Sequence, residues 1–176
     1  MNIWHDMTPG EDAPNTFNLV VEIPKGSQNK YEYDKDLNSF KLDRVLFSPF
    51  HYPGDYGFIP QTLAEDGDPA DGLVLMNFPT YPGIVINVRP IGLMPMVDNG
   101  EGDNKLLCVP EDDVRMKHIH DIGDVEKPVL DEIAHFFATY KQLEGKTVEV
   151  GEWQGADAAK AYLEKSLVTY KEKYSK

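Results

Sequence analysis

The sequence contains one cysteine, lacks any long apolar run and has few basic side chains relative to its acidic ones. Cys108 has no partner in the chain for a disulfide, which indicates a reducing compartment, and we expect the cytoplasm. No run of about 18 apolar residues is present, so we expect no membrane-spanning helix. Residues 1–15 are acidic and contain no apolar segment, so we expect no signal peptide.

The charge balance argues against two classes of partner. Thirty Asp and Glu residues outnumber 17 Lys and Arg residues, which gives a formal net charge of -13 at pH 7. Nucleic-acid affinity depends on counterion release by Lys and Arg, and anionic membranes attract the same side chains. We therefore expect neither a nucleic acid nor a membrane surface as partner.

The length and composition predict one folded domain over residues 1–176. The chain has 176 residues and is 41% hydrophobic, which is enough to bury a core. It shows no repeat of fixed period, no low-complexity tract and no linker. Thirteen prolines and 14 glycines instead divide it into short segments.

The residue patterns predict strands first and helices last. The predicted strands are Phe17 to Ile23, Lys30 to Tyr33, Phe40 to Phe47, Leu73 to Asn77, Ile84 to Met96, Lys105 to Val109 and Lys146 to Val150. A first helix has Pro128 in its first turn and ends at Gly145, and a second covers Ala156 to Tyr174. Short strands at this spacing, followed by amphipathic helices, favour a small β-barrel with one or two helices packed outside it.

The segment from Glu65 to Gly72 is the most unusual part of the sequence. It places Asp66, Asp68 and Asp71 close together, with Gly67 and Pro69 favouring a turn between them. Two unit charges at ~4 Å repel by about 4 kcal/mol at an effective dielectric of ~20. The segment is therefore either a solvated acidic loop or a site that cations neutralise.

An EF-hand does not fit this segment. Counted from Asp66, its loop would need an acidic residue at Ala70, a glycine at Asp71 and a glutamate at Asn77. A second acidic segment, Asp98 to Lys105, has Gly100 and Gly102 between its charges, and alone it would be a hairpin turn. A hard cation such as Mg²⁺ would prefer all-oxygen ligands from both segments.

The scarce basic groups and an aromatic segment are candidates for binding an anion. Lys30 and Glu32 share one face of a predicted strand, Arg44 lies in an otherwise apolar strand, and Lys141 follows a predicted helical face. Each alone is also compatible with an ordinary exposed charge. The segment Phe50 to Pro60 is either a core loop or a rigid pocket wall whose phenols face a polyanion.

Together these segments resemble the soluble inorganic pyrophosphatases of family I, in their short bacterial or archaeal form. The signature D-x-D-P-x-D occurs as DGDPAD at residues 66–71. The other motifs follow in family order: EIPKG at 22–26, KYEYDK at 30–35, FHYPGDYGF at 50–58, DNGEGDNK at 98–105 and HFFATYK at 135–141. One position departs from the pattern, because Ala70 stands where a branched apolar residue is usual, and we expect looser packing beneath the loop.

The resemblance implies a fold, an activity and a location. The fold is mainly β with α: a five-stranded OB-type β-barrel with two flanking C-terminal helices, in one catalytic domain. The activity is hydrolysis of pyrophosphate to two phosphates, which drives biosynthetic reactions that release pyrophosphate. The resemblance also implies two or more Mg²⁺ ions per subunit, pyrophosphate bound as its magnesium complex, a cytoplasmic location and a homohexamer.

The resemblance further implies roles for individual residues. Asp68 would orient or deprotonate the attacking water, and Glu32 would act through metal-bound water. The implied metal ligands are Glu22, Asp66, Asp68, Asp71, Asp98 and Asp103. The implied substrate ligands are Lys30, Arg44, Tyr52, Tyr56, Lys105, Tyr140 and Lys141.

Two other classes of function stay open on the residues alone. A barrel of this kind can hold a nucleic acid or a nucleotide without catalysis, but such modules usually need a basic groove beside their aromatics. A divalent-cation buffer would explain the carboxylates, yet it would leave the basic residues without a role. The pyrophosphatase hypothesis uses both sets, because metal ions would make an acidic cleft attractive to a polyanion.

Overall fold

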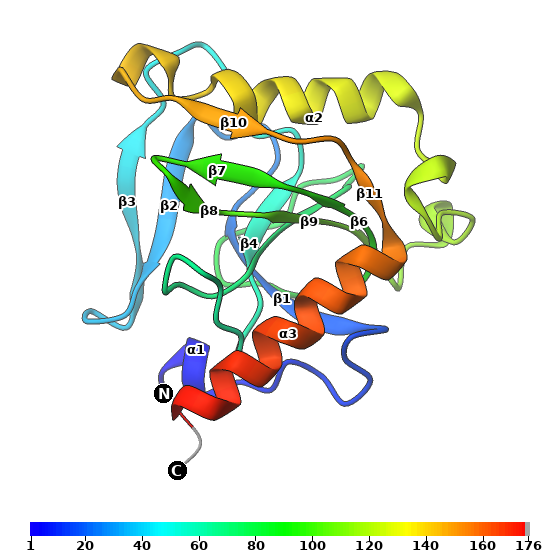
Figure 1. The fold of residues 1–176 in the computed structure, drawn as a ribbon. Helices are drawn as coiled ribbons and strands as arrows, with labels where there is room; N and C mark the ends of the chain where they lie inside the picture. Colours follow the sequence, from blue (N-terminus) through cyan, green and yellow to red (C-terminus); the bar gives the residue numbers. More distant parts are fainter. Residues whose placement is uncertain (175–176) are drawn as a thin grey trace.

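The computed structural model describes residues 1–174, and its centre is a closed barrel (Figure 1). Around the barrel the strands follow the order β1 (Phe17–Ile23), β4 (Asp55–Phe58), β5 (Asp71–Val74), β9 (Lys105–Pro110) and β6 (Val85–Met94). β1 pairs with both β4 and β6, which closes the sheet. The predicted five-stranded OB-type barrel is therefore confirmed. All pairs are antiparallel except β5–β9.

Smaller elements surround the barrel. β2 (Asn29–Asp34) and β3 (Ser39–Val45) form a separate hairpin, β11 (Gln154–Gly155) extends the barrel sheet beside β6, and β10 (Val148–Val150), β7 (Met96–Asp98) and β8 (Glu101–Gly102) form a three-stranded sheet. The helices are α1 (Ile3–Asp6), α2 (Lys127–Thr139) and α3 (Ala156–Tyr174), with 3₁₀ turns at Val114–Met116, Ile122–Asp124 and Gln142–Glu144. Within residues 1–174 no helix combines the length and the apolar character needed to cross a bilayer.

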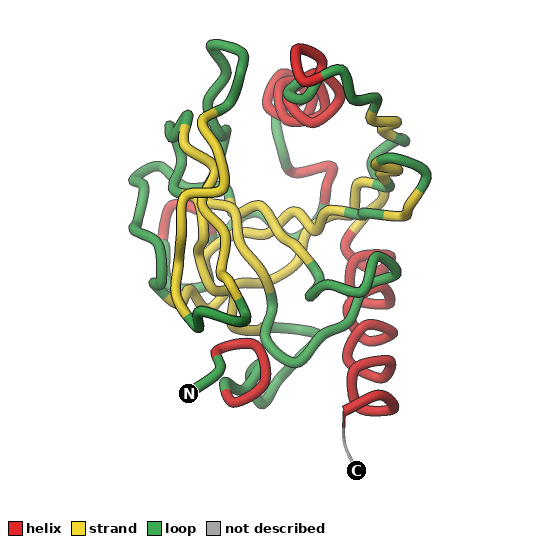
Figure 2. Tube along the Cα trace, turned by 90° about the vertical axis from the view of Figure 1, so that its left-hand side faces the viewer, coloured by secondary structure: helices red, strands yellow, loops and turns green. Residues whose placement is uncertain are grey.

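The two long helices cover different hydrophobic clusters. Adjacent strand residues point to opposite sides, so Leu107 packs in the cluster that receives Phe136 and Phe137 of α2. Its neighbour Leu106 packs in the cluster that receives Leu163 of α3. Both views show α2 and α3 apart on the outside of the barrel (Figure 1, Figure 2). Burial on both sides explains why these strands are apolar rather than alternating.

Strand β4 is the main element that the sequence patterns did not predict, because its glycine and aromatics resemble a loop. A Cβ at Gly57 would lie 1.8 Å from the carbonyl oxygen of Val20. Only glycine therefore allows β4 to approach β1 this closely. The predicted first helix also ends earlier than expected, at Thr139, and Gly145 instead ends the following 3₁₀ turn with a φ of 72°. The single predicted strand Ile84 to Met96 is divided at Pro95 into β6 and β7.

Asp55, at the start of β4, holds two loops together. It is fully buried, and its carboxylate accepts hydrogen bonds from the Lys25 N–H (2.8 Å), the Thr80 N–H (3.0 Å) and the Thr80 hydroxyl (2.6 Å). We expect Asp55→Ala to lower the free energy of unfolding by about 3 kcal/mol, because buried donors lose a charged acceptor. Urea unfolding would measure this. Thr80→Val, which removes only the hydroxyl, should cost clearly less, and equal losses would contradict the assigned role of Asp55.

Candidate active site

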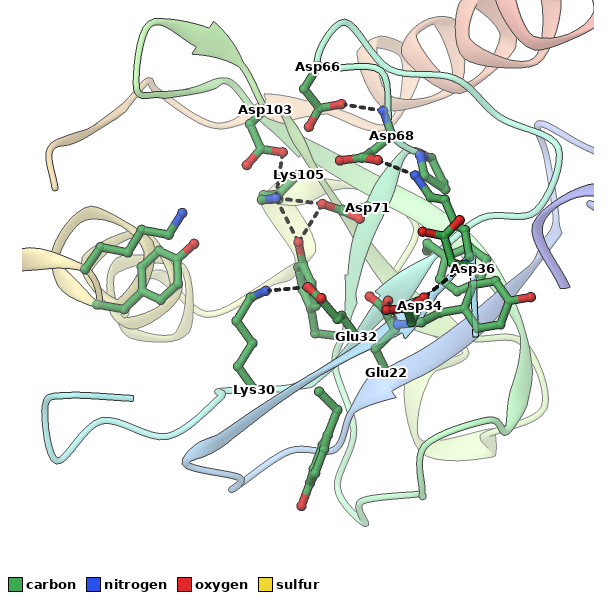
Figure 3. Close-up of a pocket in the computed structure, with 18 residues that line it drawn as sticks. Glu22, Lys30, Glu32, Asp34, Asp36, Asp66, Asp68, Asp71, Asp103 and Lys105 are labelled. Carbon is green, nitrogen blue, oxygen red and sulfur yellow. Dashed lines mark hydrogen bonds and ion pairs between the residues drawn. The ribbon is translucent and has the colours of Figure 1, made fainter. Parts of the chain in front are cut away.

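A pocket of about 490 Å³ lies beside the barrel, next to the β2–β3 hairpin (Figure 3). Its other side is formed by residues of the acidic segments Glu65 to Gly72 and Asp98 to Lys105, called here the two acidic loops. Carboxylates, lysines and tyrosines from separate parts of the chain line it. The predicted residues on its wall are Glu22, Lys30, Glu32, Tyr56, Asp66, Asp68, Asp71, Asp103, Lys105, Tyr140 and Lys141. The expectation that the two acidic segments come together in space is therefore confirmed.

Three predicted residues lie outside that wall. Asp98 lines a neighbouring pocket of about 250 Å³, which shares Asp66, Asp103 and Lys141 with the first. Tyr52 is buried in the core, where its ring packs against Phe136 with centroids 4.8 Å apart. Arg44 forms an ion pair with Glu144 at 2.8 Å. The positions of these side chains are observed, and the metal, substrate and catalytic roles of all the predicted site residues, Tyr52 and Arg44 included, stay predictions.

The first acidic loop is shaped by its own polar groups. The Asp66 carboxylate accepts the Asp68 N–H at 3.0 Å, and the Asp68 carbonyl accepts the Ala64 N–H at 2.8 Å. Gly67 between them has a φ of 87°, a conformation that favours glycine. Ala70 is fully buried, and its N–H donates to the Thr62 hydroxyl at 2.9 Å. These bonds turn the backbone so that carboxylates on both sides of the loop face the pocket.

Lys105 forms the electrostatic centre of the pocket. It is only 3% exposed, and its Nζ donates to Asp71 (2.9 Å), Asp103 (2.8 Å) and the Tyr56 hydroxyl (2.8 Å). Burial alone would lower the pKa of Lys105, but Asp71 and Asp103 outweigh it and raise the pKa far above its ordinary value. The ammonium group therefore stays charged and joins the two acidic loops.

A β-bulge directs Glu22 into the pocket. The register between β1 and β4 shifts between Val21 and Ile23, which leaves Glu22 without a partner on β4. Its carboxylate accepts the Tyr33 N–H at 2.7 Å. Loss of hydration, with a further contribution from Asp71, raises the pKa of Glu22 from 4.5 to about 8.

The raised pKa of Glu22 predicts a pH dependence of stability in the metal-free protein. Between about pH 4.5 and 8 the folded state binds a proton that the unfolded state lacks, so stability falls as pH rises through this window. We expect Glu22→Gln to match the wild type near pH 5 and to exceed it near pH 8. Each unit of pKa change is worth about 1.4 kcal/mol. Urea unfolding in EDTA would measure both proteins, and parallel pH profiles would contradict the assignment.

Desolvation also affects two predicted metal ligands. It raises the pKa of Asp66 to about 6, and Asp71 and Asp103 add to this effect. It raises the pKa of Asp103 as well, although Lys105 opposes the change. Carboxylates that are crowded and partly dehydrated are held in an unfavourable charged state, and a cation would relieve that cost.

The carboxylate oxygens of the pocket are suitable ligands for a hard cation, although they do not converge on one point in this structure. Within residues 1–174 no group of three or more acidic, histidine or cysteine side chains stands at metal-binding geometry. Lysines instead occupy these oxygens: Lys105 binds Asp71 and Asp103, and Lys141 binds Asp98. All the pocket carboxylates supply oxygen, the donor type that Mg²⁺ prefers.

The sequence patterns missed Lys35, Asp34 and Asp36 at the pocket. Lys35 lies just after β2, where the chain turns toward β3, and its ammonium group binds Asp68. It belongs to the KYEYDK motif, but its distance from Asp68 along the sequence gave no signal of this contact. Asp34 is paired with Lys41 at 2.6 Å, and that bond lowers its pKa.

Comparison with known proteins gives a consistent family. A family model described as inorganic pyrophosphatase matches residues 19–171. Inorganic pyrophosphatases of Nostoc sp. and Haloferax volcanii are each 51% identical; the matches cover 93% of this chain and 96% of the first, and 99% of this chain and of the second. The crystal structure of the enzyme from Thermus thermophilus superposes with a TM-score of 0.94 at 50% identity, covering 97% of this chain and 99% of that one. This chain belongs to the inorganic pyrophosphatase family.

Proposed function

We propose that this protein is a magnesium-dependent inorganic pyrophosphatase whose active site is the pocket between the β2–β3 hairpin and the two acidic loops. Family membership supports hydrolysis of pyrophosphate to phosphate. The observation that carries the site assignment is the joint placement of Asp66, Asp71 and Asp103 with Lys105 on one pocket wall. The family also favours an enzyme over a nucleic-acid module or a cation buffer.

The residues proposed to hold two or more Mg²⁺ ions come from both acidic loops and from β1. They are Glu22, Asp66, Asp68, Asp71, Asp98 and Asp103. When bound, the ions supply positive charge for the substrate, which arrives as its magnesium complex, and lower the pKa of water. Asp71 and Asp103 both pair with the Lys105 ammonium, which supports the proposal that positive charge is favourable beside these two carboxylates.

Asp68 is proposed to act on the attacking water. Its side chain is 62% exposed at the pocket, where a water can reach it. As the water oxygen bonds to one phosphorus, Asp68 takes the proton and the bond from that phosphorus to the bridging oxygen breaks, which releases the second phosphate. Glu32, on the opposite wall, is proposed to orient water rather than to contact substrate.

The cationic and phenolic groups are proposed to bind phosphate oxygens. Lys30, Lys105, Tyr56, Tyr140 and Lys141 approach the pocket from different elements. Charge that moves onto the leaving phosphate would be stabilised by these donors, which the fold already holds in place. Arg44, opposite Lys30 in the β2–β3 hairpin, and Tyr52, whose ring centroid lies 5.5 Å from that of Tyr56, are proposed to join them.

The proposed location and assembly go beyond the family assignment. We place the protein in the cytoplasm, as a single catalytic domain over residues 1–176, of which 175–176 lie outside the described part. Apolar side chains remain exposed on the described chain, including Phe47, Phe78 and Tyr81, and they are compatible with subunit contacts in a homohexamer. Light scattering should then give about six times the subunit mass of 19.9 kDa; a monomer mass would contradict the hexamer.

A phosphate-release assay tests the activity and its metal requirement together. With pyrophosphate as substrate, we expect rapid release in Mg²⁺ and loss of release in EDTA, restored when Mg²⁺ is added back. Equal release with and without Mg²⁺ would contradict the metal proposal. No release under any condition would contradict the enzyme itself.

A further inference from the structure

Lys35 has two contacts that the proposed function does not explain. Its Nζ donates to Oδ1 of Asp68 and lies 4.4 Å from the centroid of the Trp4 ring. The first contact joins it to the residue proposed to act on water. The second joins it to α1, which precedes the part of the chain that the family model matches, residues 19–171.

Trp4 is a rigid support for this lysine. The residue is 4% exposed, and its indole N–H donates to the Thr62 carbonyl at 2.9 Å. Its ring stacks on His5 with centroids 4.4 Å apart and meets the edge of Tyr174 in α3 at 5.5 Å. Trp4 also lies near Tyr170, with ring centroids 6.1 Å apart, so α1 contacts the C-terminal part of α3, where Figure 1 shows it.

Trp4 is also connected, through Thr62, to the C-terminal part of the first acidic loop. Thr62, whose carbonyl binds the Trp4 ring, also accepts the Ala70 N–H through its hydroxyl. Contacts therefore run from Trp4 through Thr62 to Ala70 on one side, and from Trp4 through Lys35 to Asp68 on the other. Lys35 and the loop that carries Asp68 are therefore both connected to Trp4.

The Asp68 side chain has little else to hold it. Its backbone is fixed by Asp66 and Ala64, but within residues 1–174 the only hydrogen-bond or ion-pair partner of its carboxylate is Lys35, at Oδ1. Oδ2 makes no hydrogen bond or ion pair in that part of the chain, and the side chain is largely exposed at the pocket. Without Lys35, no other side chain within residues 1–174 would hold this carboxylate, and its orientation would depend on bound metal alone.

We propose that Lys35, supported by the Trp4 ring, is a positioning residue that orients Asp68, so that the N-terminal helix α1 is part of the active site. The proposal rests on the role of Asp68 in the proposed function. A cation over an indole face is held more firmly than a solvated lysine, and a held cation fixes the carboxylate that it binds. Lys35 itself contacts neither the reacting atoms nor, on this proposal, the substrate.

The first test separates orientation from substrate binding. We expect Lys35→Met to lower kcat for pyrophosphate in Mg²⁺ by about 10- to 100-fold, the usual effect of losing a partner that orients a site group. KM should stay within about threefold of the wild-type value, because an interaction needed only in the reaction step is lost. Lys35→Arg should recover most of kcat, since a guanidinium keeps the charge and stacks on tryptophan.

The second test concerns Trp4. We expect Trp4→Leu to lower kcat less than Lys35→Met, and the double variant to be no slower than Lys35→Met alone, because Trp4 acts through the lysine. Multiplied effects in the double variant would contradict the support by Trp4. If Trp4→Leu does not fold, as judged by urea unfolding, the Lys35→Met and Lys35→Arg pair still decides the role of Lys35.

Two controls make the outcomes separable. Lys127 forms an exposed ion pair with Asp131 at 2.5 Å, away from the pocket, so Lys127→Met should leave kcat unchanged. Asp68→Asn is measured in parallel. Normal turnover in Asp68→Asn would overturn the proposed function of Asp68 and this inference with it. An inactive Asp68→Asn together with normal kcat in Lys35→Met, or a lower kcat that arginine does not recover, would overturn this inference alone.

Discussion

Asp68→Asn is expected to lower the turnover of pyrophosphate by about 10²- to 10⁴-fold, the range for loss of a general base. Asparagine has nearly the same shape as aspartate but cannot accept the proton of the attacking water. The Asp68 side chain is largely exposed and its backbone bonds do not involve the carboxylate, so the fold should persist. Steady-state phosphate release would measure the loss, and urea unfolding would confirm the fold.

A matched control for this variant is Asp131→Asn. Asp131 also pairs with a lysine, but on the exposed face of α2. The turnover of pyrophosphate by Asp131→Asn should equal that of the wild type. Near-normal turnover in Asp68→Asn would remove Asp68 from the role of base, and the neighbouring carboxylates would then be the next candidates.

Lys105→Met is expected to have the second large effect, and this effect should depend on metal. Removing the buried ammonium leaves Asp71 and Asp103 without their positive partner, and the loss of one member of a buried ion pair costs about 3–5 kcal/mol. In EDTA we therefore expect a strongly reduced free energy of unfolding. Saturating Mg²⁺ should recover part of it, because a ligand that binds only the folded state stabilises that state.

Urea unfolding in EDTA and in Mg²⁺ would measure both values. Lys127→Met is again the control, since its exposed pair should contribute less than about 1 kcal/mol under either condition. If Mg²⁺ recovers nothing in Lys105→Met, the proposal that Asp71 and Asp103 hold Mg²⁺ is wrong.

Much of the site could be predicted because its residues lie in short segments with strong local character. The turn from Asp66 to Asp71 contains closely spaced carboxylates with glycine and proline, and this pattern alone indicates convergence. That Asp103 of the second acidic loop meets them depends on the parallel pairing of β5 with β9, which sets Asp71 opposite Lys105. The family resemblance implied that Asp103 shares a site with Asp66 and Asp71, whereas the strand pairing that brings them together was not predicted.

The elements that escaped prediction depend on contacts between distant segments. In the sequence, Gly57 is typical of a loop. In the structure it lies in strand β4, because only glycine fits against the carbonyl oxygen of Val20 on β1. The contact of Lys35 with Trp4 and Asp68 joins three separate segments, and no local spacing encodes it. The placement of Tyr52 in the core and of Arg44 beside Glu144 likewise follows from packing rather than from motif.

The bulge in β1 serves the pocket rather than the barrel. Val21 and Ile23 already stand opposite Gly57 and Tyr56, two successive residues of β4, and Glu22 is the extra residue between them. Deleting Glu22 would therefore leave a regular ladder, and the pairing of the residues before it would not change. The loss would fall on the pocket, whose wall includes Glu22 as the acidic residue that β1 contributes. Removal of this one codon should thus leave a closed barrel with an altered pocket.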